Sequence, residues 1–223
     1  MIKPSEPSTP PKEIKYRYFR WGPFLFHTEV TQEECDMILK EGKKCRRKSN
    51  DYRSGLAGHL SEEYKFLDAE GIISWLKNYF NAYCIGYNKW RGEGTMKPNF
   101  TLASLWINYM KAGDFNPPHD HGADLSFVLY PDVPDEISQE CDAFKGTMRG
   151  PGGISWTYGE GDSTCISVVH QLPKTGDLYI FPASLKHYVF PFKSPVTRVS
   201  VSGNIMLDQD SRIDSFTEKE KKH

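Results

Sequence analysis

The stretch from Trp106 to Tyr130, WINYMKAGDFNPPHDHGADLSFVLY, constrains the fold most, because it places two histidines one residue apart between two strand-like runs. Residues i and i+2 of a strand point to the same face, so His119 and His121 are predicted to converge while Asp120 points away. Imidazole is a common ligand of several transition metals. The stretch therefore predicts a metal site, which still needs a third ligand.

The end of the chain, GDLYIFPASLKHYVFPFKSPVTRVSVSGNI, offers that ligand in His187, which opens a short apolar run after a turn that contains proline. Arg198 follows eleven residues later, and it shares one face of the last strand with Ser200, Ser202 and Asn204. An arginine on a strand commonly pairs with a carboxylate across the surface, but these small polar neighbours suit the wall of a cavity better. Arg198 is therefore predicted to present a guanidinium that can hold a carboxylate with two hydrogen bonds.

This order of residues resembles the iron(II)- and 2-oxoglutarate-dependent oxygenases, especially the prolyl-hydroxylase-like branch: H-x-(ligand), a long gap, then a histidine followed by R-x-S. The resemblance covers 101–130 and 174–206, and it includes Gly113 and the phrase GDLYIFPASLKHYV. It implies a mainly β fold with α additions, a double-stranded β-helix (a distorted jelly roll) backed by N-terminal helices.

The resemblance also implies roles for single residues and a reaction. His119 would be the first metal ligand and His187 the distal one, while Arg198 and Ser200 would clamp the far carboxylate of 2-oxoglutarate. The implied cofactors are iron(II), 2-oxoglutarate as cosubstrate and ascorbate as a reductant. The implied activity is that of an oxidoreductase, a dioxygenase that hydroxylates a substrate carbon while 2-oxoglutarate is converted to succinate. Asn108, in phase with the neighbouring strand residues, is a further candidate hydrogen-bond partner of the cosubstrate.

One position departs from the family pattern. The second ligand is usually Asp or Glu, in H-x-D or H-x-E, whereas this chain has His121 there and its carboxylate one residue earlier, at Asp120. Strand geometry predicts His121 as the ligand. The alternative is a local bulge that rotates Asp120 inward, since bulges gather beside active sites.

Two other functions compete with this reading. The first is a three-histidine, cupin-like metal dioxygenase that does not use 2-oxoglutarate, and the second is a non-catalytic jelly-roll binding module with a vestigial metal site. A carboxylate clamp at Arg198 distinguishes the 2-oxoglutarate enzyme from the cupin-like dioxygenase, which has no need of it. Retention of a metal distinguishes both enzymes from the binding module.

The 223 residues suit one domain, for which we expect a loose tail at 1–15, an oxygenase domain at 16–208 with an insert at 131–174, and a charged tail at 209–223. A formal net charge of −1 gives no general attraction to nucleic acid or anionic membranes. The substrate is expected to be a small molecule or a peptide. Five scattered cysteines without a C-x-x-C pair, and the lack of a long apolar run, predict a cytoplasmic protein.

Two helices are expected before the strands. A capping box of Thr31 and Glu34 starts the first, over Thr31–Lys44, and an apolar rhythm between Ile72 and Tyr83 marks the second, which should back the sheet. The insert is rich in Gly and Pro and is expected to be partly loop. Within it, Trp156 and Tyr158 could equally line a substrate cleft or anchor short extra strands.

Overall fold

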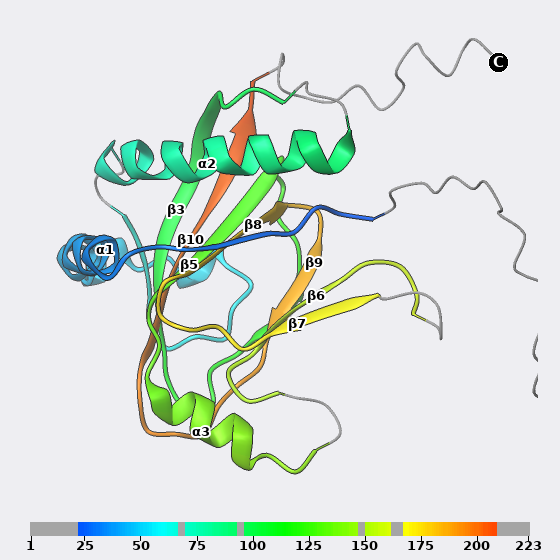
Figure 1. The fold of residues 1–223 in the computed structure, drawn as a ribbon. Coiled ribbons are helices and arrows are strands. Elements are labelled where there is room, and N and C mark those ends of the chain that lie inside the picture. The colour runs from blue at the N-terminus through cyan, green and yellow to red at the C-terminus, as the bar shows by residue number, and fades with distance from the viewer. Residues whose placement is uncertain (1–21, 67–69, 93–95, 147–149, 162–166, 209–223) are drawn as a thin grey trace, which may run out of the picture.

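The structure is a computed structural model that describes residues 22–66, 70–92, 96–146, 150–161 and 167–208. In this part of the chain the strands form two antiparallel sheets (Figure 1). The strand order of the larger sheet is β1-β8-β5-β10-β3-β2, and that of the smaller sheet is β4-β9-β6-β7. The mainly β fold with helical additions is confirmed.

The strands have the following bounds. The larger sheet contains β1 (Phe26–Glu29), β2 (Glu63–Lys65), β3 (Phe100–Met110), β5 (Leu125–Asp132), β8 (Asp177–Pro182) and β10 (Arg198–Leu207). The smaller sheet contains β4 (Asn116–His119), β6 (Ile154–Thr157), β7 (Val168–Gln171) and β9 (Lys186–Val189).

The first helix, α1 (Gln32–Cys45), begins at the predicted capping box. The Thr31 hydroxyl accepts the N–H of Glu34, and the Thr31 N–H donates to the Glu34 carboxylate. Two short 3-10 turns follow, η1 (Lys48–Asn50) and η2 (Arg53–Gly55), and then α2 (Glu70–Arg91), which is longer than its apolar rhythm alone indicated. A third helix, α3 (Asp135–Ala143), comes after β5.

One hydrophobic core joins α1 and α2 to the outer face of the larger sheet, and Figure 1 shows α2 crossing over β3, β10 and β5. Ile38 of α1 and Leu76 of α2 are fully buried there with Ile107 and Val201 of the sheet. The alternation predicted for the last strand is confirmed, because Val199 and its apolar partners face this core while the polar residues of β10 face the other way. The helices therefore back the sheet as expected.

A second core fills the space between the two sheets. Trp156, at 2% exposure, packs there with its ring 5.1 Å from Tyr179 and 5.6 Å from Phe181. Trp156 lies on β6 and directly opposite His187 of β9, whereas Tyr158 is 47% exposed. Of the two readings of this aromatic pair, the structure therefore supports the anchoring of an extra strand for Trp156.

The segment expected as an insert, 131–174, supplies regular structure as well as turns. It contains α3, β6 and β7, and β6 lies between β9 and β7 in the smaller sheet. The glycine-rich turn before β6 explains why the pattern looked like loop, since short strands beside such turns carry little periodic signal. The tails predicted at 1–15 and 209–223 lie outside the described residues. None of the helices that the structure describes is long and apolar enough to span a membrane.

Candidate metal and cosubstrate site

Three histidines converge between the two sheets. His119, His121 and His187 each offer one ring nitrogen, and these three atoms all lie within 4.8 Å of one another. His119 is the register partner of His187 on β4 and β9, with ring centroids 4.3 Å apart, and the ring of His121 is 5.1 Å from each. This is the convergence that the spacing predicts.

Asp120 is exposed and is not part of this cluster. The irregularity in β4 lies between Asn116 and His119, before the histidine pair. Beyond the end of the strand, the N–H of His121 donates to the carbonyl of Ala183 at 2.9 Å, which holds this segment against the turn before β9. In the structure it is therefore His121, and not Asp120, that lies beside the other two histidines.

Backbone carbonyls orient two of the three rings. Nδ1 of His119 is 2.7 Å from the carbonyl of Pro117, and Nδ1 of His187 is 2.9 Å from that of Leu185. Each contact needs the proton on Nδ1 and so leaves the Nε2 lone pair free. Metal-binding histidines commonly donate one ring N–H to a carbonyl or carboxylate in this way, which fixes the ring and directs the other nitrogen at the metal.

Burial favours the neutral form of two of the three imidazoles, those of His121 and His187. It lowers the pKa of His187 to about 3 and that of His121 to about 4, with a smaller contribution in each case from the nearby His119. A neutral imidazole can bind a cation without first losing a proton. These two donors can therefore bind a transition metal near neutral pH without first losing a proton.

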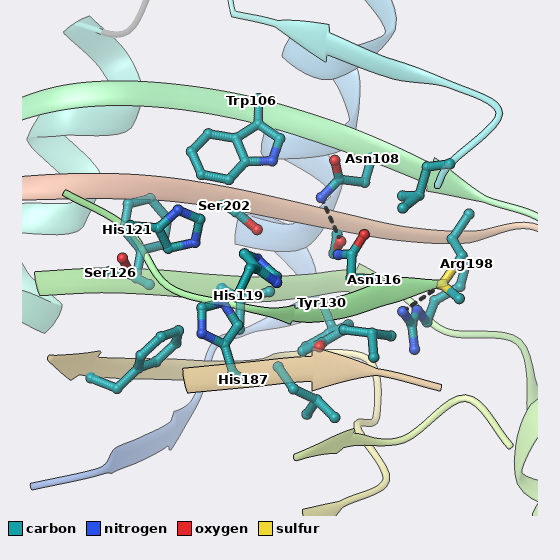
Figure 2. A pocket seen from close by; sticks show the side chains of 18 residues that line it. Trp106, Asn108, Asn116, His119, His121, Ser126, Tyr130, His187, Arg198 and Ser202 are labelled. Carbon is teal, nitrogen blue, oxygen red and sulfur yellow. Dashed lines mark hydrogen bonds between the residues drawn. The ribbon is translucent and has the colours of Figure 1, made fainter. Parts of the chain in front are cut away.

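A cavity extends from the three histidines. Figure 2 shows the imidazoles grouped in one part of it and Arg198 at the other end, with Asn116 and Tyr130 between them. Its walls come from both sheets and include apolar side chains: Leu60, Val128, Ile154, Phe181 and Val189.

Arg198 is a buried charge without an acidic partner in the part of the chain that the structure describes. It is 2% exposed, its Nη1 donates to the carbonyl of Gly152, its Nη2 lies 2.8 Å from Sδ of Met110, and its guanidinium is 5.2 Å from the centre of the Tyr130 ring. Its Nε has no partner, and none of the described carboxylates pairs with it. Burial lowers its pKa. An unpaired buried ion costs several kcal/mol, so such a group indicates an anionic ligand.

Ser200 and Asn108 complete the polar wall beside Arg198. Nδ2 of Asn108 donates to Oγ of Ser200 at 3.1 Å, and both residues are buried and line the cavity. The structure thus brings all six predicted site residues to one cavity: His119, His121, His187, Arg198, Ser200 and Asn108.

The sequence did not single out several residues of this cavity. Tyr130 and Asn116 both line it, and Gly152 reaches Arg198 through its carbonyl. Tyr130 lies two residues after Val128 on β5, so both side chains are on the same face of the strand, and both line the cavity. This spacing could have identified Tyr130 from the sequence. A backbone carbonyl from a distant turn leaves no such signal.

Comparison with known proteins agrees with this geometry. Residues 104–204 match a family model described as "Putative 2OG-Fe(II) oxygenase". A search of curated proteins found no match to the chain.

Solved structures share the fold at low identity. The Pseudomonas putida prolyl-4-hydroxylase has a TM-score of 0.50 and 14% identity, and the alignment covers 82% of this chain and 92% of that chain. The non-haem alpha-ketoglutarate-dependent epimerase SnoN from nogalamycin biosynthesis has a TM-score of 0.51 and 16% identity, with 82% of this chain and 78% of that chain covered.

The fold and the cavity define a jelly-roll protein with a three-histidine cluster and a buried arginine. The family match spans all of these residues, so the segment that carries the site, 104–204, is similar to the iron(II)- and 2-oxoglutarate-dependent oxygenases. Enzymes of this superfamily use iron(II) as cofactor and 2-oxoglutarate as cosubstrate.

Proposed function

We propose that the protein is a hydroxylase in which His119, His121 and His187 hold iron(II), while Arg198 and Ser200 hold the far carboxylate of 2-oxoglutarate. The observation that carries the proposal is the placement of Arg198, a fully buried cation without an acidic partner among the described residues, at the opposite end of the cavity from the histidines. Asn108 supports Ser200 through its hydrogen bond.

The positive charge of the site favours a dianionic cosubstrate. Three neutral imidazoles leave a divalent metal with its full charge of two, whereas the carboxylate of the usual H-x-D pattern would remove one unit. The near carboxylate of 2-oxoglutarate would offset one unit of the metal's charge, and Arg198 would pair with the far carboxylate. The substitution of His121 for a carboxylate therefore strengthens the attraction for the cosubstrate, although it makes oxidised states of iron less accessible.

The residues of the chain have separate tasks in this mechanism. His119 and His187 present Nε2 because backbone carbonyls occupy their Nδ1 protons. Arg198 and Ser200 orient the cosubstrate, and the apolar walls of the cavity exclude water. When bound, iron(II) supplies the oxygen and redox chemistry, and the protein supplies orientation and electrostatics.

The substrate is proposed to be a small molecule or a peptide that approaches the histidine end of the cavity, hydroxylated at a carbon atom, with ascorbate as a reductant for the iron. The protein is proposed to work in the cytoplasm. The four cysteines that the structure describes are free thiols, in keeping with a reducing compartment. They are Cys35, Cys45, Cys84 and Cys141.

Two other functions are less well supported. A cupin-like dioxygenase that does without 2-oxoglutarate could use the same three histidines, but it has no need of an unpaired buried guanidinium. A binding module with a vestigial site would not need two rings whose Nδ1 atoms are fixed by backbone carbonyls.

The test is formation of succinate from 2-oxoglutarate by the purified protein with iron(II), oxygen and ascorbate, in the absence of a substrate. We expect slow uncoupled turnover above that of a metal-free control. Arg198→Ala should abolish it, while Arg47→Ala, a change at an exposed arginine, should not. Succinate no faster than in the metal-free control across several pH values would favour the binding module.

A further inference from the structure

A row of three polar residues crosses the larger sheet beside the cavity. Ser200 on β10 is the register partner of Asn108 on β3, and Asn108 is in turn the register partner of Glu63 on β2. Directly opposite residues of antiparallel strands point to the same face, with Cβ atoms roughly 4.5–5.5 Å apart. Glu63 therefore lies next to Asn108 on the side away from Ser200.

The row holds two buried oxygens that lack a donor. Nδ2 of Asn108 donates to Ser200, which leaves Oδ1 for a different neighbour, and β2 is the strand on the other side of β3. This Oδ1 and Oε2 of Glu63 are both buried, and neither has a hydrogen-bond partner among the described residues. Neighbouring acceptors of this kind are unfavourable unless a proton lies between them.

The two carboxyl oxygens of Glu63 differ in their surroundings. A Cβ built on Gly58 would lie 3.1 Å from Oε1 of Glu63 and 2.3 Å from Oδ1 of Asn116. Oε2 is the buried oxygen without a hydrogen-bond partner among the described residues, and it is the one assigned to Asn108 in the proposal.

We propose that Glu63 is a positioning residue that keeps its carboxyl proton and donates it to Oδ1 of Asn108, so that the hydroxyl of Ser200 is directed at the far carboxylate of 2-oxoglutarate. The proposal rests on the proposed function. Glu63 itself does not touch the cosubstrate, because Asn108 and Ser200 stand between them.

The surroundings of Glu63 favour the protonated form. Burial is the main cause that raises the pKa of Glu63 to about 7, with smaller contributions from Asp114 and Asp51, while Arg53 lowers it. Arg53 is already paired with Asp51 at 2.6 Å. The Asp114 carboxylate accepts from the backbone N–H and the hydroxyl of Ser61. None of these groups offers the Glu63 carboxylate a proton donor.

When Glu63 is protonated, the direction of each hydrogen bond in the row is fixed. Glu63 donates to Oδ1 of Asn108, Nδ2 of Asn108 donates to Oγ of Ser200, and the Ser200 hydroxyl keeps its own proton for a ligand in the cavity. No described acceptor takes that proton. If Glu63 ionises, its carboxylate attracts the amide N–H of Asn108, the amide turns over, and Ser200 must then donate to Asn108 instead of the cosubstrate.

The test is titration calorimetry of 2-oxoglutarate against Mn(II)-loaded protein at pH 6 and pH 8. With a pKa of about 7, the protonated fraction of Glu63 falls from about 0.9 to about 0.1 over this range, so the wild-type Kd should rise about tenfold. Glu63→Gln, whose amide donates at every pH, should keep tight binding with a change of about twofold or less. Glu29→Gln, at an exposed strand position, should behave like the wild type.

A second variant separates the hydrogen-bond chain from the charge of Glu63. Ser200→Ala removes the hydroxyl that ends the row of hydrogen bonds. Binding of 2-oxoglutarate should therefore be weaker at pH 6 and nearly independent of pH. Parallel pH profiles in the wild type and Glu63→Gln, with binding still lost in Arg198→Ala, would overturn the role of Glu63 and leave the proposed function standing. Absence of 2-oxoglutarate binding by the wild type at both pH values would overturn both.

Discussion

His119 and His187 face each other directly across β4 and β9, and each donates its Nδ1 proton to a backbone carbonyl two residues earlier in the chain. The same hydrogen bond therefore orients an imidazole ring on two strands that are far apart in sequence. His121, in contrast, reaches the cluster from beyond the end of β4.

Arg198→Ala should weaken 2-oxoglutarate binding while metal affinity is nearly unchanged. The variant leaves the cosubstrate carboxylate buried without its charged partner, which costs roughly 2–5 kcal/mol of binding free energy. Titration calorimetry of 2-oxoglutarate and metal analysis after dialysis measure the two effects separately. Unchanged affinity for 2-oxoglutarate would remove Arg198 from the site.

Trp156→Ala should destabilise the protein and disturb the histidine cluster together. Removing a fully buried aromatic side chain costs about 3–5 kcal/mol, and Phe181, which packs against Trp156, also lies 4.9 Å from the ring of His187. Denaturant unfolding gives the stability, and metal content gives the effect on the site. Tyr158→Ala is the matched control, since that side chain is largely exposed and its loss should change neither quantity.

The sequence predicted which side chains share a face better than it predicted the connections around them. The period of two along β10 placed Arg198 and Ser200 on one face, and the spacing of His119 and His121 predicted their convergence. These are local rules, and the structure agrees with both.

Long-range partners could not be predicted in this way. The contact of Arg198 with the carbonyl of Gly152, and the position of Glu63 opposite Asn108, depend on which strands become neighbours. Strand order is set by the packing of the whole sandwich and not by any local pattern. The short strand β6 was hidden for a related reason, because four residues beside a glycine-rich turn are too few to show alternation.

The stability of the metal-free protein should fall as the pH falls from about 6.5 toward 4. His121 has a pKa of about 4 when folded and about 6.5 when unfolded, so between these values the unfolded chain binds a proton that the folded chain does not. His121→Gln removes this difference, and its melting temperature should fall less between pH 7 and pH 5 than that of the wild type. Calorimetric scans of both proteins separate the contribution of His121 from those of other groups. The same change of melting temperature with pH in both proteins would contradict the prediction.

The last prediction concerns the position where the chain departs from the family pattern. The proposed ligand is His121, since its ring lies beside the other two histidines while Asp120 is exposed. His121→Ala should therefore lose most of the bound iron(II) or Mn(II) on dialysis, because only two ligands remain. Asp120→Ala should lose little, with a small change at most from the removal of a nearby negative charge.

A third variant makes this comparison sharper. His121→Asp restores the carboxylate of the usual pattern and lowers the charge of the metal site by one unit. It should retain metal but bind the dianionic 2-oxoglutarate more weakly than the wild type, because the attraction for the cosubstrate decreases. Metal content after dialysis and 2-oxoglutarate titration of all three variants decide the matter. If Asp120→Ala loses the metal and His121→Ala keeps it, the carboxylate is the ligand, and the strand beyond His119 must rotate when metal binds.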